Sequence, residues 1–163
     1  MVEQKNNEDF WNACELGDPN KVQDILLQAK DSMKFPFDID SESIDNWTAL
    51  HLATNEGHLK IMEKLIDSGA NIEAETTLKR TPLHIAAIRG NIEAVRTLVM
   101  KSAKVNAQDD DDNTALHIAS ERGFGEIVEF LLNNHADPKK LNLYKKTPID
   151  LSQNENTRRI YDR

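Results

Sequence analysis

A four-residue phrase that begins with threonine occurs four times in this chain of 163 residues, always at an interval of 33 residues. The copies begin at Thr48, Thr81, Thr114 and Thr147, and the first three of them end in Leu-His. Self-similarity at a period of about 20 to 50 residues predicts a stack of identical supersecondary units. The period therefore restricts the chain to a repeat architecture before any single element is assigned.

Each period carries the pattern of a short helix followed by a second apolar stripe. The side-chain oxygen of Thr81 can cap a helix start, and Pro82 falls at the first helical position, where a missing N–H is tolerated. Gly90 suits a left-handed C-terminal cap, so this helix has about two turns. The spacing of the stripe that follows predicts a second helix with Ile92, Ala94, Val95, Leu98 and Val99 on one face. A single unit cannot bury such a face alone, so neighbouring units must share one continuous core.

The phrase Thr-Pro-Leu-His-Ile-Ala at Thr81 and the 33-residue period together resemble the ankyrin repeat. The resemblance implies an all-α ankyrin-repeat solenoid of about five helix-turn-helix units with β-turn fingers. We expect residues 1–8 to be flexible and residues 9–163 to form one ankyrin-repeat domain. Its expected units are an N-terminal cap repeat over 9–40, repeats over about 41–73, 74–106 and 107–139, and a truncated C-terminal repeat over 140–163.

The N-terminal repeat carries an insertion. Gly17 precedes Gly57 by 40 residues instead of 33, which places seven extra residues within the segment 28–38. The apolar residues of this segment either fold back on the N-terminal repeat, which we favour, or form part of a docking surface. Trp11 stands at the place of the motif histidine, as is typical of an irregular terminal repeat.

The finger tips depart from the family pattern, which has glycine two residues before the motif threonine. The residues at this place are Asn46, Lys79, Asp112 and Lys145. Lysine adopts a positive φ less readily than asparagine or aspartate does. We therefore expect the second and fourth fingers to be slightly strained or differently turned. Ser102 and His135 likewise replace the glycine that commonly ends the second helix.

The last repeat departs furthest from the pattern. Asp150, Ser152 and Asn156 stand where the other repeats have histidine, alanine and glycine, and Ile160 and Tyr161 are its only later apolar residues. Either this segment is a minimal polar cap or the chain is a fragment of a longer protein. We favour the fragment, because a terminal cap more often completes its second helix.

Composition limits the classes of partner. The net charge is −8 and the isoelectric point is about 5.1, which disfavours nucleic acid and anionic membranes as general partners. The sequence has no apolar run of about 18 residues and no signal peptide, so we expect no membrane insertion and a cytoplasmic or nuclear location. Cys14 is the single cysteine, which fits a reducing compartment and a buried structural role. We further expect a monomer.

No constellation of residues indicates catalysis. His51, His84 and His117 recur once per repeat, so they cannot converge within about 2 Å of one metal ion. The resemblance implies instead that each histidine bridges neighbouring backbone and the motif threonine. The sequence also lacks a phosphate-binding loop, a nucleophile elbow and a paired zinc motif. We expect no metal, no cofactor and no enzymatic activity.

The densest run of charge is Asp109 to Asp112. An EF-hand loop starting at Asp109 would require a glycine and a glutamate at places where this chain has Thr114 and Ser120. We interpret the run as a solvated finger, with an acidic site for a basic partner as the alternative. Asn106 resembles the finger-base asparagine that is hydroxylated in some relatives, a modification that the sequence leaves open.

The concave face of a repeat stack, formed by finger tips and short helices, is where we expect a protein or extended peptide to bind. Aromatic residues and arginine are the types most enriched in binding hot spots. The predicted binding residues are Trp47, Leu78, Arg80, Ile88, Arg89, Asp110, Asp111, Asn113, Arg122, Tyr144 and Lys146. Packing of Trp47 against the next finger, and pairing of the arginines with nearby carboxylates, remain alternatives.

The function that the sequence favours is thus a non-catalytic protein-interaction module or scaffold. The alternative is a targeting or regulatory domain of a larger enzyme or channel, such as a kinase or an acyltransferase.

Overall fold

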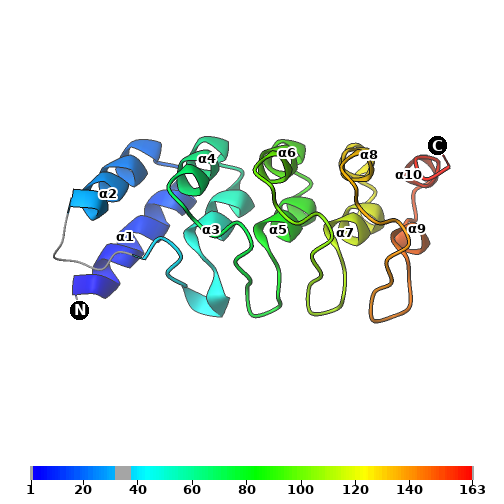
Figure 1. Ribbon diagram of the computed structural model, residues 1–163, viewed down its shortest axis with the longest axis horizontal. Coiled ribbons are helices and arrows are strands. Elements are labelled where there is room, and N and C mark those ends of the chain that lie inside the picture. Colours follow the sequence, from blue (N-terminus) through cyan, green and yellow to red (C-terminus); the bar gives the residue numbers. More distant parts are fainter. Residues whose placement is uncertain (1, 32–37, 163) are drawn as a thin grey trace.

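The computed structural model describes residues 2–31 and 38–162, and every regular element in them is helical. Figure 1 shows the helices in two rows, with loops projecting below the inner row as fingers. The inner row contains α1 (Val2–Leu16), α3 (Ala49–Glu56), α5 (Pro82–Arg89), α7 (Ala115–Glu121) and α9 (Pro148–Leu151). The outer row contains α2 (Pro19–Asp31), α4 (Leu59–Asp67), α6 (Ile92–Met100), α8 (Gly125–Asn133) and α10 (Glu155–Arg158). The predicted all-α solenoid of about five units is confirmed.

The N-terminal repeat begins with the longest described helix. Helix α1 has 15 residues and begins at Val2, within the segment 1–8. Trp11 donates an N–H to the carbonyl oxygen of Ser41 at 3.2 Å and so ties the first repeat to the first finger. Most of the insertion lies outside the described residues.

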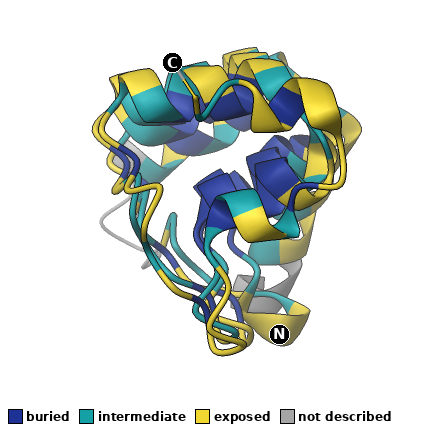
Figure 2. Ribbon diagram, turned by 90° about the vertical axis from the view of Figure 1, so that its right-hand side faces the viewer, coloured by how far each residue is buried: buried dark blue, intermediate teal, exposed yellow. Residues whose placement is uncertain are grey.

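The core runs through the whole stack, as the period predicts. Equivalent leucines of the inner helices, Leu50, Leu83 and Leu116, are each at most 2% exposed. In the outer row, Leu65 and Leu98 are fully buried at equivalent places of α4 and α6. Figure 2 shows the buried residues concentrated on the sides of the two helix layers that face each other. Each unit thus covers the apolar flank of the next.

Glycine at the end of the inner helix α5 meets two constraints at once. Gly90 has a φ of 69°, in the left-handed region that other residues adopt only with strain. A Cβ atom at this position would also lie 2.7 Å from the ring of Phe124 in the following repeat. The glycine therefore ends its own helix and lets the next repeat approach closely.

The motif histidines connect each inner helix to the following finger. In each of three repeats, Nδ1 accepts the backbone N–H of the motif threonine at 3.1 to 3.2 Å, which completes a capping box. Since Nδ1 accepts, Nε2 carries the proton and donates it to a carbonyl oxygen of the next finger. These bonds are His51 to Arg80 at 2.9 Å, His84 to Asn113 at 3.1 Å and His117 to Lys146 at 3.2 Å. The structural role that the resemblance implied is confirmed.

Burial keeps these imidazoles neutral. Loss of solvent lowers the pKa of His51 from 6.5 to about 4, and burial also lowers the pKa of His84 and His117. Hydrogen bonds from Nε2 to the finger carbonyls oppose this effect without reversing it. The neutral ring is the form that can accept at Nδ1 and donate at Nε2 at the same time.

In the last repeat an aspartate takes over half of the histidine's role. The carboxylate of Asp150 accepts the backbone N–H of Thr147 at 2.9 Å and its hydroxyl at 2.7 Å. These bonds hold the pKa of Asp150 below its usual value. Helix α9 has four residues, and Asn156 lies inside α10 rather than at the end of the inner helix. Tyr161 then packs against the core, with its hydroxyl hydrogen-bonded to Ser120.

The tip residue has a left-handed backbone in all four fingers, so of our two alternatives for the second and fourth fingers, strain or a different turn, strain applies. In the first finger the residue before the tip, Asp45, is left-handed as well, with a φ of 61°. Lys79 and Lys145 have φ values of 52° and 58°, beside 59° for both Asn46 and Asp112. Each finger is closed by backbone bonds, such as those from Thr76 N–H to the Arg80 carbonyl and from Lys79 N–H to the Thr76 carbonyl. These bonds impose a left-handed φ on the tip residue whatever its type. Lys79 and Lys145 therefore carry backbone strain, and the turn of their fingers does not change.

Acid should unfold the stack partly by protonating the histidines. The unfolded chain binds a proton at His51 below about pH 6.5 while the folded chain does not until about pH 4, so stability falls as pH decreases through this window. The full shift corresponds to on the order of 3 kcal/mol. His51→Gln keeps a capping-box residue that cannot titrate, and should flatten the profile of unfolding free energy between pH 4 and 6.5. Parallel profiles for the two proteins in urea titrations would refute this.

Glycine at the end of α6 should stabilise the protein. Ser102 is exposed with a φ of 69°, at the place where the preceding repeat has Gly69. Ser102→Gly should raise the free energy of unfolding by about 1 kcal/mol, since it removes left-handed strain. The matched control is Ser68→Gly, where φ is −90° and glycine should weaken the fold. Urea denaturation of both variants checks the prediction, and equal effects would contradict it.

Candidate functional site

A groove of about 300 Å³ runs between the fingers and the inner helices of the last three repeats. Figure 2, which looks along the stack, shows the fingers below the inner row of helices. Its lining consists of Arg80, Ile88, Asp109, Asp111, Asn113, Ile118, Glu121, Arg122, Asn142, Tyr144 and Leu151. This is the concave face that the repeat pattern predicts.

The groove brings together six of the predicted binding residues. They are Arg80, Ile88, Asp111, Asn113, Arg122 and Tyr144. The sequence analysis did not predict Ile118 and Leu151, which occupy equivalent places of α7 and α9. The period alone contained the signal for this pair, because both side chains stand one residue after the motif histidine or its aspartate replacement.

Asp109 is buried, which corrects the interpretation of the acidic run as a solvated finger. Its side chain is 3% exposed, and one carboxylate oxygen accepts the backbone N–H groups of Asp111 and Asn113 at 3.0 and 2.9 Å. The other oxygen lies 3.7 Å from Nε of Arg80. Asp109 therefore shapes the third finger from within and neutralises Arg80, while Asp110 is exposed as expected.

Arg122 carries the groove's uncompensated positive charge. It is exposed just after α7, and within the described residues no carboxylate lies at ion-pair distance from its guanidinium. Glu121 and Asp111 line the same groove with charges of opposite sign. Tyr144 is 69% exposed at the tip of the fourth finger, and its ring adds an apolar surface. The lining thus offers mixed charge beside exposed apolar area.

Five predicted binding residues lie outside the groove lining. Leu78, Asp110 and Lys146 are exposed on the fingers, and Asp110 lies 3.6 Å from Nζ of Lys79. Arg89 donates from Nε to the Asn55 carbonyl at 3.1 Å, and its guanidinium lies 3.6 Å from Glu56. The alternative that this arginine pairs with a nearby carboxylate is therefore confirmed.

Trp47 packs within its own repeat. The indole is half-buried, and its ring centre lies 5.9 Å from that of His51. The packing alternative is thus closer to the structure than a free anchor, although the contact is with its own inner helix rather than with the next finger. The tryptophan shields the imidazole that bridges to the second finger.

The described residues provide no obvious reaction centre. In that part of the chain no three His, Cys, Asp or Glu side chains are grouped as metal ligands. Burial raises the pKa of the Cys14 thiol to about 12, so a reactive thiolate is not formed there. The Asn106 amide accepts the N–H of Asp137 at 2.8 Å and donates to the His135 carbonyl at 3.0 Å, which ties two repeats together. Among the described helices, none is both long and apolar enough to cross a bilayer.

Comparison with known proteins agrees with this architecture. The family of ankyrin repeats in three copies matches residues 10–109 and 73–142. Human ankyrin repeat domain-containing protein 39 is 36% identical over 67 residues, which cover 41% of this chain and 33% of the human protein. The chain thus matches about one third of that relative's length. Since the family match extends over well more than half of the sequence, the chain belongs to the ankyrin repeat family.

Proposed function

We propose that the protein is a non-catalytic interaction module that binds an extended segment of a partner protein in the concave groove. Ankyrin repeats generally mediate protein–protein interaction. The observation that carries the finer proposal is the groove itself, which combines an exposed tyrosine, an unpaired arginine and apolar side chains of three inner helices.

The shape of the groove favours an extended partner segment. Its lining residues come from three consecutive repeats, Arg80 and Ile88 from one, Arg122 from the next and Leu151 from the last. A segment that contacts all three must follow the axis of the stack. A standard interface buries about 800 Å² on each partner, so contacts on the exposed fingers would add to those in the groove.

The charges of the groove favour a partner of mixed charge. Arg122 can pair with a partner carboxylate, while Glu121 and Asp111 can pair with a partner lysine or arginine. Such exposed pairs set orientation more than affinity, each contributing about 0 to 1 kcal/mol. Most of the affinity should come from burial of Tyr144 and the apolar lining.

A double variant on the concave face tests the proposal. Arg122→Ala with Tyr144→Ala should raise the Kd for the partner at least about tenfold, because each is a hot-spot residue type. The partner is first isolated by affinity purification with the wild-type chain, and its Kd is then measured by calorimetry.

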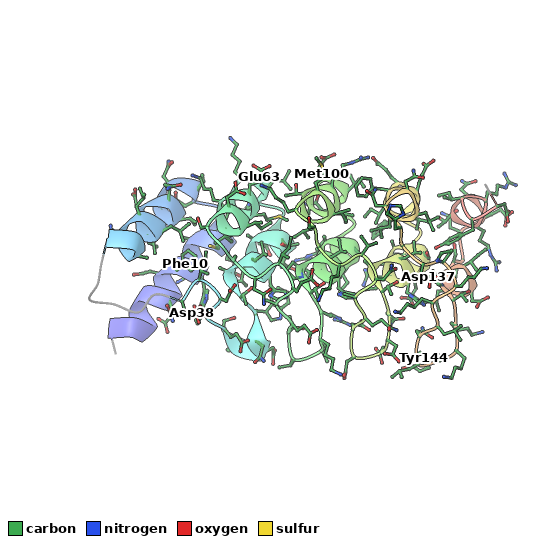
Figure 3. All side chains as sticks on the ribbon, in the orientation of Figure 1. Phe10, Asp38, Glu63, Met100, Asp137 and Tyr144 are labelled. Carbon is green, nitrogen blue, oxygen red and sulfur yellow. The ribbon has the colours of Figure 1, made fainter. Side chains whose placement is uncertain are left out.

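The control likewise removes one cationic and one large apolar side chain, but from the opposite face. Lys60 and Met100 are exposed on the outer helices α4 and α6, and Figure 3 places Met100 on the far side of the molecule from Tyr144. Lys60→Ala with Met100→Ala should change the Kd by less than about twofold. Unchanged binding by the concave variant, or a larger loss in the convex control, would exclude the groove.

A further inference from the structure

The fourth finger carries a cluster of lysines that the repeat pattern does not require. We call residues 139–146 the basic finger; its cations are Lys139, Lys140, Lys145 and Lys146. The same places in the third finger hold Asn106, Ala107, Asp112 and Asn113. Within the described residues, none of the four lysines lies at ion-pair distance from a carboxylate, whereas Lys79 of the second finger lies 3.6 Å from Asp110. The cluster is therefore not explained by pairing inside the protein.

Exposed apolar side chains lie among these cations. Leu141 is 48% exposed, Leu143 is 55% exposed and Tyr144 is 69% exposed. The equivalent residues of the third finger are polar: Gln108, Asp110 and Asp111. Two leucines and a tyrosine left in water on one short loop are a marker of an interaction surface. The second finger also places an exposed leucine, Leu78, beside a lysine, but that lysine lies 3.6 Å from Asp110.

We propose that the basic finger binds a short acidic segment of a partner protein in which apolar residues alternate with carboxylates. The carboxylates would pair with the four lysines, and the apolar residues would cover Leu141 and Leu143. This site goes beyond the groove proposed above. Of the residues 139–146, only Asn142 and Tyr144 also line the groove, and Asn142 is buried.

A protein segment fits this surface better than a nucleic acid does. The chain as a whole has a net charge of −8, and the neighbouring third finger contains Asp110, Asp111 and Asp112. A long polyanion extends beyond the finger and would be repelled by these charges. A short peptide can contact the lysines without reaching far beyond them, and electrostatic repulsion is largely screened beyond about one Debye length, roughly 8 Å. Nucleic acid also offers no aliphatic groups that would cover the two leucines.

The test uses the fluorescein-labelled peptide Glu-Glu-Leu-Glu-Leu-Glu-Glu and measures its anisotropy with the full chain at physiological ionic strength. The wild type should bind it, and Lys139→Glu with Lys145→Glu should raise the Kd at least about tenfold, because attraction becomes repulsion. The control Lys60→Glu with Lys104→Glu makes the same change in net charge at two other exposed lysines and should alter the Kd by less than about twofold.

Two further arms separate the alternatives. Replacing both peptide leucines by serine should weaken binding severalfold, as should Leu141→Ser in the protein, because the apolar contact is lost. Arg122→Glu should leave peptide binding intact, which distinguishes the basic finger from the concave groove. No binding by the wild type, equal binding by the two charge-reversed proteins, loss of binding with Arg122→Glu, or tighter binding of a single-stranded oligonucleotide of equal charge would each overturn the proposal.

Discussion

A neutral imidazole, repeated in three successive units, connects local helix capping to the stacking of the repeats. His84 caps its own helix through Nδ1 and holds the carbonyl of Asn113 in the following finger through Nε2. One ring thereby fixes both the start of a helix too short to be stable alone and the position of the next finger. Burial of the ring among packed repeats keeps it neutral, and the neutral ring in turn keeps the repeats in register. Stacking and capping are therefore mutually dependent.

The fingers show how a fixed backbone leaves side chains free to vary. Tip residues as different as Asn46 and Lys79 share a left-handed φ, because closing bonds within each finger and one bond to its neighbour determine the loop. In the third and fourth fingers, the side chains of Asp109 and Asn142 also accept backbone N–H groups of their own loop. The acidic third finger and the basic fourth finger can thus share one shape while presenting opposite charges. The exposed charges of a finger can therefore change without a change in its backbone.

The sequence predicted the parts of the structure that repeat, and it failed where contacts depend on how repeats are placed against one another. The capping threonines, the buried leucines and the histidine bridges follow from one 33-residue unit and its neighbour. The burial of Asp109 beside Arg80 and the contact of Trp47 with His51 depend on side-chain placement in space, for which the period has no signal. The sequence predicted six residues of the groove lining, because a concave face is a property of the whole stack. It did not predict how far the groove extends.

The change from histidine to aspartate in the fourth copy of the motif separates the two tasks of the motif side chain. Asp150 still caps its helix, which is a local task, but it has no second nitrogen to donate. Each of the three histidines joins both tasks, because it accepts at Nδ1 from the start of its own helix and donates at Nε2 to the following finger. Capping therefore needs only an acceptor, whereas the bridge to the next finger needs a donor on the same side chain.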